Sequence, residues 1–263
     1  MPRSPEAARQ APTEFQSMVR ATLVYGFIAL YLLVMGPIAL TWTFLSKETR
    51  LMYDLARFCI RVAGILGGVR VRTSGKDKIE PGQTYVFLSN HQGNADAPVL
   101  AHAVPRDWRA LIKREVMRLP ILSLVLRQVK MVPIDRSDAQ KARTSIDTGV
   151  KLLRQGYSFI AFPEGTRSRD GRLGTFKKGV FIMALKAGVP VVPISIIDSN
   201  RIQPPGEYAI RPGVVKVIFH DPIPTAGLTM EDRDRLVEAT RAAIASALPG
   251  QAGISAGSSA SCP

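Results

Sequence analysis

An imidazole, His91, stands five residues before a carboxylate, Asp96. A β-prone apolar run, residues 85–89, leads into this stretch, and a helix-compatible run, residues 99–103, follows it. Pro98 suits the first turn of a helix and disfavours the α conformation at the residue before it, so His91 is predicted to lie on the loop between a strand and a helix. On such a loop the two side chains can converge, whereas in one continuous helix they would point about 140° apart.

A carboxylate that holds an imidazole fixes its tautomer and stabilises the imidazolium that forms when the ring takes a proton. The pair of His91 and Asp96 therefore indicates general-base catalysis. The alternative is that Asp96 only caps the following helix and that His91 is an ordinary loop histidine. The two other histidines, His102 and His220, are predicted to be a helix residue and a strand-end residue without catalytic roles.

A second polar loop follows a predicted strand at residues 158–162 and combines acid, hydroxyl, glycine and arginine side chains. Arginine matches a phosphate bidentately, and the start of the next helix offers free backbone N–H groups beside it. Gly165 allows the backbone to approach a ligand closely. The loop thus suits a phosphate site, whereas Glu164 and Arg167 taken alone favour the alternative of a solvated ion pair on a turn.

The net charge of the 263-residue chain is +14, which predicts an anionic partner: nucleic acid, an anionic membrane surface or a phosphorylated substrate. Aromatic residues are only 7% of the chain and no element for reading or stacking on bases is apparent, which argues against nucleic acid. Cys59 and Cys262 have no metal-ligand spacing, so we expect no zinc site and a reducing compartment.

The N-terminal part of the chain is predicted to be a membrane anchor at residues 18–67, behind a disordered segment at residues 1–17. Residues 21–46 carry no charge and are long enough to cross a hydrocarbon core of about 30 Å. Gly36-Pro37 interrupts this run, so a kinked or re-entrant helix is an alternative to a span, and a buried globular helix is a third. Residues 47–67 are predicted to be an amphipathic interfacial helix. The excess of Lys and Arg over Asp and Glu in residues 47–80 favours the cytoplasmic side for this flank.

Residues 68–248 alternate between predicted strands and helices, which indicates an α/β domain with a mixed, largely parallel sheet flanked by helices. The predicted strands are residues 69–73, 85–89, 108–113, 129–134, 158–162, 191–197 and 214–219. The predicted helices are residues 98–103, 139–155, 177–187 and 229–248. Ligands bind at the carboxyl ends of the strands in such sheets, where both polar loops fall. The Gly/Ala/Ser-rich tail at 249–263 is predicted to be disordered.

The motifs Asn90-His91-x4-Asp96 and Phe162-Pro163-Glu164-Gly165-Thr166-Arg167 together resemble those of the glycerolipid acyltransferase family, whose best-known members are the 1-acyl-sn-glycerol-3-phosphate acyltransferases. The resemblance covers roughly residues 69–197. It continues in three further segments, Lys113-Arg114-Glu115, Ile134-Asp135-Arg136 and Val191-Val192-Pro193-Ile194. It implies the glycerolphosphate-acyltransferase-like fold, with an apolar helical segment in front of the α/β domain.

By this resemblance His91 is the general base and Asp96 is its orienting partner. The resemblance assigns the phosphate and glycerol of the acceptor to six residues: Lys113, Arg136, Glu164, Gly165, Thr166 and Arg167. The chain departs from the family pattern at Gly93, where serine is common, and at Lys130 and Pro133, where glycine and phenylalanine are usual. Neither departure touches the catalytic pair, but both leave the identity of the acceptor open.

The implied reaction moves a fatty acyl group from a thioester of coenzyme A or acyl carrier protein to the sn-2 hydroxyl of 1-acyl-sn-glycerol 3-phosphate (lysophosphatidic acid), giving phosphatidic acid. Because the thioester is already activated, we expect no metal, bound cofactor or covalent acyl-enzyme, and the sequence supplies no obvious nucleophilic serine motif of the Gly-x-Ser-x-Gly kind between a predicted strand and a predicted helix. Backbone N–H groups of residues 92–94 are expected to bind the oxyanion. Phe181, Met183 and Leu185 are predicted to be core residues, with the lining of an acyl tunnel as the alternative.

Three other acceptors are alternatives: a lyso-ornithine lipid, lysophosphatidylglycerol and glycerol 3-phosphate. A different class of protein is a further alternative, namely a non-catalytic protein that binds anionic membrane lipids. Intact His91 and Asp96 argue against the non-catalytic alternative. The Arg/Ala-rich composition favours a bacterial inner membrane, with the catalytic domain on the cytoplasmic side.

Overall fold

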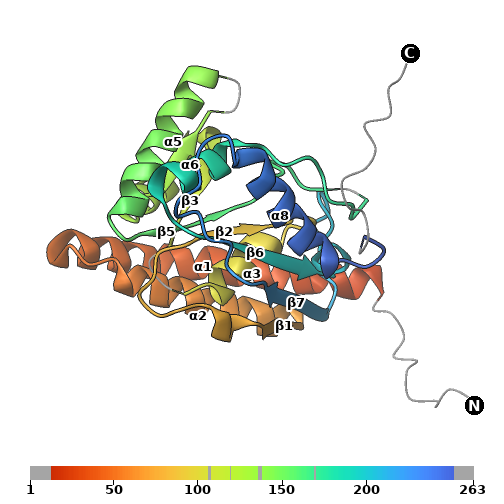
Figure 1. Ribbon diagram of the computed structural model, residues 1–263. Coiled ribbons are helices and arrows are strands. Elements are labelled where there is room, and N and C mark those ends of the chain that lie inside the picture. Colours follow the sequence, from red (N-terminus) through yellow and green to blue (C-terminus); the bar gives the residue numbers. More distant parts are fainter. Residues whose placement is uncertain (1–12, 106–107, 119, 136–137, 169, 252–263) are drawn as a thin grey trace, which may run out of the picture.

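The computed structural model describes residues 13–105, 108–118, 120–135, 138–168 and 170–251 (Figure 1). Within them, seven strands form one sheet in the order β1-β7-β6-β2-β5-β3-β4. The strands are β1 (Val69–Ser74), β2 (Val86–Ser89), β3 (Trp108–Lys113), β4 (Val132–Ile134), β5 (Ser158–Ala161), β6 (Val191–Ile197) and β7 (Gly213–Phe219). Only the pairing of β6 with β7 is antiparallel, so the predicted mixed, largely parallel α/β sheet is confirmed.

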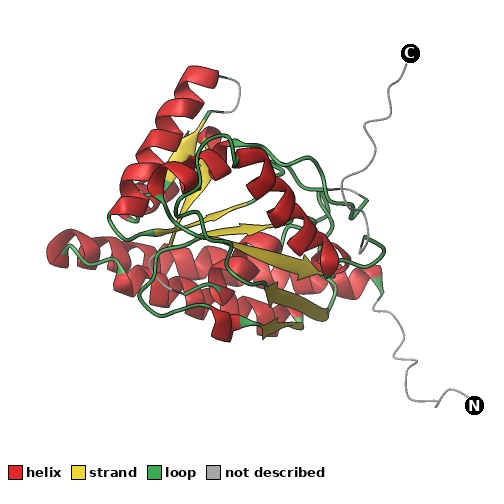
Figure 2. Cartoon of the chain, in the orientation of Figure 1, coloured by secondary structure: helices red, strands yellow, loops and turns green. Residues whose placement is uncertain are grey.

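Helices cover both faces of this sheet (Figure 2). They are α1 (Glu14–Ser46), α2 (Arg50–Gly67), α3 (Asp96–Ala103), α4 (Pro120–Gln128), α5 (Ala139–Arg154), α6 (Gly179–Ala187), α7 (Ser199–Ile202) and α8 (Arg233–Ser246), with short 3-10 turns at Lys76–Lys78 and Arg114–Arg118. Helices α5, α6 and α8 pack on one face, and α1, α2 and α3 lie on the other (Figure 1). The central strands β2 and β6 are buried along their whole length, as their continuous apolar sequences require.

Helix α1 begins four residues before the predicted anchor, because Thr13 and Gln16 form a capping box at its start. It continues through Pro37 as one helix of 33 residues. Many of its apolar side chains are exposed, among them Leu30, Leu33 and Leu45. By length and composition α1 can cross a membrane, and it fits a membrane-associated protein.

Helix α2 packs against α1, and the pair is joined to the α/β domain at both ends of α1. The backbone N–H of Ile210 donates to the carbonyl of Ser17 over 3.2 Å near the first end. Near the other end, Ala39 packs with Tyr53 and with Val129, which directly follows α4. Helix α1 therefore lies along the domain rather than leading away from it.

The structure describes only part of the two chain ends that were predicted to be disordered. Residues 1–12 and 252–263 lie outside the described residues. Residues 249–251, predicted to belong to the disordered tail, are described, and the Gln251 side chain accepts from the N–H of Leu173 and donates to the carbonyl of Gly171.

Helix α4 was not predicted, since its Leu/Ile/Val-rich sequence has no clear helical cap.

Candidate active site

The loop that carries His91 leaves the carboxyl end of β2, where Asn90 fixes its starting point. The Asn90 side chain donates to the carbonyl of Ile196 and accepts from the N–H of the same residue, each over 2.8 Å. A buried amide thus takes the place of a backbone pairing between β2 and β6. The loop therefore starts from a rigid part of the sheet.

The side chains of His91 and Asp96 meet across this loop, as their spacing predicts. His91 Nδ1 lies 2.8 Å from Asp96 Oδ2. The same oxygen accepts from the N–H groups of Gln92, at 2.6 Å, and Gly93, at 2.8 Å. Asp96 is fully buried in the first turn of α3, whose N-terminal dipole favours a negative charge there. The carboxylate therefore orders the loop and orients the imidazole at once.

The imidazole ring is held in place by a second contact. It stacks on Phe162 at the end of β5, with ring centroids 4.0 Å apart and an interplanar angle of 17°. The side chain of His91 remains 19% exposed. Because Nδ1 faces Asp96, Nε2 is the ring nitrogen that a substrate can reach.

Glu164, predicted to touch the acceptor, instead joins the two polar loops through its buried carboxylate. Its Oε1 accepts from the N–H of His91 over 2.8 Å, and its Oε2 accepts from the N–H of Gly174 over 2.9 Å. Burial raises the pKa of the Glu164 carboxyl above its ordinary value, and the two N–H donors oppose that rise. These contacts assign Glu164 to the positioning of His91.

Replacing Glu164 by Gln should lower the rate of catalysis roughly 10- to 100-fold, because a small displacement of the base is costly. The amide supplies only one acceptor for two N–H donors, so the free energy of unfolding should also fall by about 1–3 kcal/mol. Steady-state kinetics and thermal unfolding would measure both, with the exposed α8 substitution Glu238→Gln as the control. A Glu164→Gln protein with unchanged kcat would contradict the positioning role.

His91 opens into a cavity of about 510 Å³ at the carboxyl ends of β2, β3, β4 and β5. We call it the site cavity; its lining includes Leu111, Lys113, Ile134, Ile146, Gly165, Thr166, Arg167, Lys177 and Val180. Lys113, Gly165, Thr166 and Arg167 were predicted site residues and come together here, whereas Arg136 lies outside the described residues. The lining combines cationic and apolar side chains, which suits an anionic amphiphile.

Two side chains of this region, those of Lys177 and Asn94, were not given a role by the sequence. The Lys177 side chain crosses the backbone of Gly165, since a Cβ there would lie 3.0 Å from its Cε. Asn94 accepts a hydrogen bond from the Arg167 guanidinium and donates to the carbonyls of Pro204 and Glu207. The sequence offered one signal for each: Lys177 stands at the start of a predicted helix, and Asn94 lies inside the first motif.

The expectation that residues 92–94 bind the oxyanion is wrong. The N–H groups of Gln92 and Gly93 donate to Asp96, and that of Asn94 donates to the carbonyl of Gln203 over 3.0 Å. These donors order the loop, so an oxyanion needs donors from another part of the cavity wall.

Other predicted features have simple structural explanations. A Cβ at Gly93 would lie 2.7 Å from the carbonyl oxygen of Ser199, so the segment of α7 leaves no room for the serine common in the family. Phe181, Met183 and Leu185 belong to the core between the sheet and its helices, as predicted.

In the described part of the chain, no group of three or more His, Cys, Asp and Glu side chains could hold a metal ion.

The structure thus places an imidazole, oriented by a carboxylate, at the carboxyl edge of an α/β sheet and beside cationic side chains. Residues 70–197 match the model of the family described as Acyltransferase. Over this stretch, which is just under half of the chain, the protein is similar to that family.

Curated relatives have consistent names. A chloroplastic 1-acyl-sn-glycerol-3-phosphate acyltransferase of Arabidopsis thaliana is 39% identical over 52% of this chain and 39% of its own length. A 1-acyl-sn-glycerol-3-phosphate acyltransferase of Chlamydomonas reinhardtii is 31% identical over 83% of this chain and 64% of its own length. The human 1-acyl-sn-glycerol-3-phosphate acyltransferase alpha is 32% identical, over 67% and 62% respectively. The chain thus spans less than two thirds of the length of these relatives.

The fold also has a solved counterpart. The crystal structure of the 1-acyl-sn-glycerophosphate (LPA) acyltransferase PlsC from Thermotoga maritima superposes with a TM-score of 0.75, over 88% of this chain and 97% of that chain. The sequences are 24% identical, so this likeness concerns the fold.

Proposed function

We propose that the protein transfers a fatty acyl group from an acyl thioester to the sn-2 hydroxyl of 1-acyl-sn-glycerol 3-phosphate, giving phosphatidic acid for phospholipid synthesis. One observation carries the proposal: His91, oriented by Asp96, opens into a cavity that also holds Lys113, Arg167 and Lys177. The names of the relatives support the same acceptor.

In the proposed mechanism the acceptor hydroxyl lies against Nε2 of His91. The ring takes the hydroxyl proton as the oxygen attacks the thioester carbonyl, and Asp96 stabilises the imidazolium that results. The tetrahedral intermediate then collapses and expels the thiolate, which receives the proton from the imidazolium. An ester bond forms, a thioester bond breaks, and the histidine returns to its neutral form without a metal or an acyl-enzyme.

The three cations are proposed to bind the acceptor phosphate, with Arg167 as the main contact because its guanidinium forms two parallel hydrogen bonds to a phosphate. Arg136, outside the described residues, is proposed as a second phosphate ligand. Thr166, which is exposed in the same cavity, is proposed to contact the glycerol, and Gly165 to let the backbone approach it. The donor is a thioester of coenzyme A or acyl carrier protein.

Replacing Arg167 by Ala should raise KM for lysophosphatidic acid about 10- to 100-fold, since a charged hydrogen bond to the phosphate contributes about 1.5–3 kcal/mol. Arg172→Ala is the matched control, because Arg172 lies on the same loop with its side chain 85% exposed and does not line the site cavity. Acceptor saturation curves with a labelled thioester would measure both. If the two variants have equal KM values for lysophosphatidic acid, Arg167 does not bind the phosphate.

The same assay separates the remaining acceptors. Lysophosphatidic acid and glycerol 3-phosphate carry a phosphate monoester, lysophosphatidylglycerol carries a diester, and a lyso-ornithine lipid carries none. If Arg167→Ala weakens transfer to a lyso-ornithine lipid as much as transfer to lysophosphatidic acid, recognition of a phosphate is not the role of this arginine.

Helices α1 and α2 are proposed to hold the domain on the cytoplasmic side of a bacterial inner membrane, with α1 lying along one leaflet. Contacts to the domain at both Ser17 and Ala39 support an in-plane arrangement over a span. We expect cysteines at Phe15 and Phe44, in a Cys59→Ser, Cys262→Ser background, to react with an impermeant maleimide from the same side of the vesicle. Labelling from opposite sides would establish a span.

A further inference from the structure

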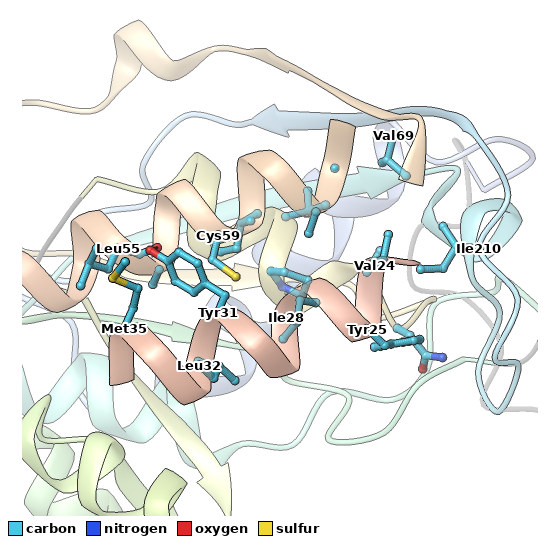
Figure 3. Close-up of a pocket in the computed structure, with 18 of the residues that line it drawn as sticks. Val24, Tyr25, Ile28, Tyr31, Leu32, Met35, Leu55, Cys59, Val69 and Ile210 are labelled. Carbon is cyan, nitrogen blue, oxygen red and sulfur yellow. Dashed lines mark hydrogen bonds between the residues drawn. The ribbon is translucent and has the colours of Figure 1, made fainter. Parts of the chain in front are cut away.

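Helix α2 has two different sides. On one side Leu55 and Cys59 lie beside Tyr31 and Met35 of α1, across an apolar hollow (Figure 3). The other side of α2 borders a polar hollow of about 520 Å³. We call it the basic pocket; its lining includes Asp54, Arg57, Phe58, Arg61, Lys76 and His102.

The basic pocket is separate from the site cavity. Its lining comes from α2, the edge strand β1, the 3-10 turn at Lys76–Lys78 and the end of α3, whereas the site cavity lies at the carboxyl ends of β2 to β5. The two hollows share no lining residue. An anion in the basic pocket therefore does not occupy the place proposed for the acceptor phosphate.

Three permanent cations from two elements of the fold line the basic pocket. Arg57 and Arg61 stand four residues apart on α2, so their side chains lie on the same face of the helix. Lys76 comes from the turn after β1, where Gly75 has a φ of 70°. A Cβ at Gly75 would collide with the carbonyl oxygen of Phe219, so this turn requires glycine and holds Lys76 in place.

Two of the cations are exposed to a ligand, whereas the third is partly committed to the fold. The Arg57 guanidinium donates to the carbonyls of His102 and Val104, over 2.9 and 3.4 Å, at the end of α3. Arg61 and Lys76 are exposed, and neither has an ion-pair partner in the described part of the chain. A ligand would thus meet two exposed cations beside a third that is fixed.

The charges of the pocket affect the titratable groups in it. Burial and then the charge of Arg57 lower the pKa of Lys76. Burial also lowers the pKa of His102, and all three cations add to that effect. Asp54 is the one carboxylate among the described residues of the lining and does not balance three cations. A bound anion would therefore relieve the repulsion between them.

The α2 side of the pocket has an apolar rim. Phe58 lines the pocket and is 56% exposed, and Ile65, further along α2, is 77% exposed. Arg61 lies between them on the same face of the helix. An exposed apolar stripe with a cation in its middle is typical of a helix at a membrane surface, where the cation reaches the headgroups. The rim therefore favours a lipid headgroup over a free phosphate as the source of the anion.

We propose that the basic pocket binds the phosphate monoester of an anionic membrane lipid, with Arg61 and Lys76 in contact with the phosphate and Arg57 as a fixed charge beside them. A phosphate monoester carries about 1.5 to 2 negative charges near pH 7, which suits three cations better than the single charge of a diester. The inference goes beyond the proposed function, because neither the acyl donor nor the acceptor enters it.

Binding to vesicles of phosphatidylcholine that contain either phosphatidic acid or phosphatidylglycerol, at equal surface charge, tests the proposal. We expect the parent protein to bind the phosphatidic acid vesicles about tenfold more tightly, and the double variant Arg61→Gln, Lys76→Gln to lose this preference. The matched control is Arg70→Gln, Arg72→Gln, which removes the same charge from exposed positions of β1 outside the pocket and should keep the preference. Thermal unfolding would show that each variant is folded. A parent without the preference, or equal losses in the two double variants, would overturn the proposal.

Two further arms identify the site and the source of the phosphate. Phosphatidic acid is also the proposed product, so Arg167→Ala is compared in the same assay and should keep the preference. If Arg167→Ala loses the preference while the double variant at Arg61 and Lys76 keeps it, the lipid binds in the site cavity and the inference fails. Inorganic phosphate, added at constant ionic strength, should leave the preference intact; if it abolishes the preference, the pocket takes free phosphate and the lipid source is wrong.

The outcome is distinguishable from that of the proposed function. A protein that shows the preference, loses it in the double variant and yet transfers no acyl group to lysophosphatidic acid would refute the proposed function and support this site.

Discussion

Replacing His91 by Ala is expected to reduce acyl transfer by about 10²- to 10⁴-fold, the usual contribution of a general base. The fold should persist, because the loop is ordered by Asp96 and Glu164 through backbone N–H groups that alanine retains. Initial rates with a labelled acyl thioester and lysophosphatidic acid would measure the loss. Circular dichroism and vesicle binding would show whether folding and membrane association are unchanged.

His102→Ala is the matched control for this variant. His102 follows on α3 and does not line the site cavity, so its removal should leave the rate of transfer within a factor of about two of the parent. Retention of most of the activity by His91→Ala would mean that another group takes the hydroxyl proton, and the proposed mechanism would then fail.

Asp96→Asn is expected to lower kcat by about 10²- to 10⁴-fold, although the side chain keeps its shape. The amide oxygen can still accept from the loop, but the negative charge that stabilises the imidazolium is lost. Asp96 is fully buried and accepts three hydrogen bonds, so we also expect a loss of about 1–3 kcal/mol in the free energy of unfolding. Kinetics and chemical denaturation would measure the two effects separately.

Asp170→Asn is the control for the second variant, because Asp170 is an exposed carboxylate of the neighbouring loop whose partners are Ser168 and Arg172. Its kcat should match that of the parent. If Asp96→Asn loses stability but keeps its kcat, Asp96 orders the loop without assisting the proton transfer.

Much of the fold follows from local patterns in the sequence. The continuous apolar runs of β2 and β6 predict buried parallel strands, and the predicted bounds of β3 and β6 are those of the structure. Pro98 and the five-residue spacing predict the meeting of His91 with Asp96, because both residues lie on one short loop. These patterns are local, so they can be interpreted from the sequence without knowledge of the tertiary structure.

Contacts between distant segments could not be predicted in the same way. The family resemblance assigned Glu164 to the acceptor site, yet its oxygens accept from the N–H groups of His91, 73 positions before it, and of Gly174, 10 positions after it. The N–H groups of residues 92–94 were expected to bind the oxyanion, but Asp96 and the carbonyl of Gln203 accept from them.

The most direct test of the account is a product analysis with the purified protein in liposomes, using a thioester with a labelled acyl group and 1-acyl-sn-glycerol 3-phosphate. We expect the parent protein to form labelled phosphatidic acid with the label at the sn-2 position, and His91→Ala to lose this product. Release of the label only as free fatty acid, or its transfer to another lysolipid but not to this one, would contradict the proposed acceptor. Equal formation of labelled phosphatidic acid by the parent and by His91→Ala would contradict the proposed base.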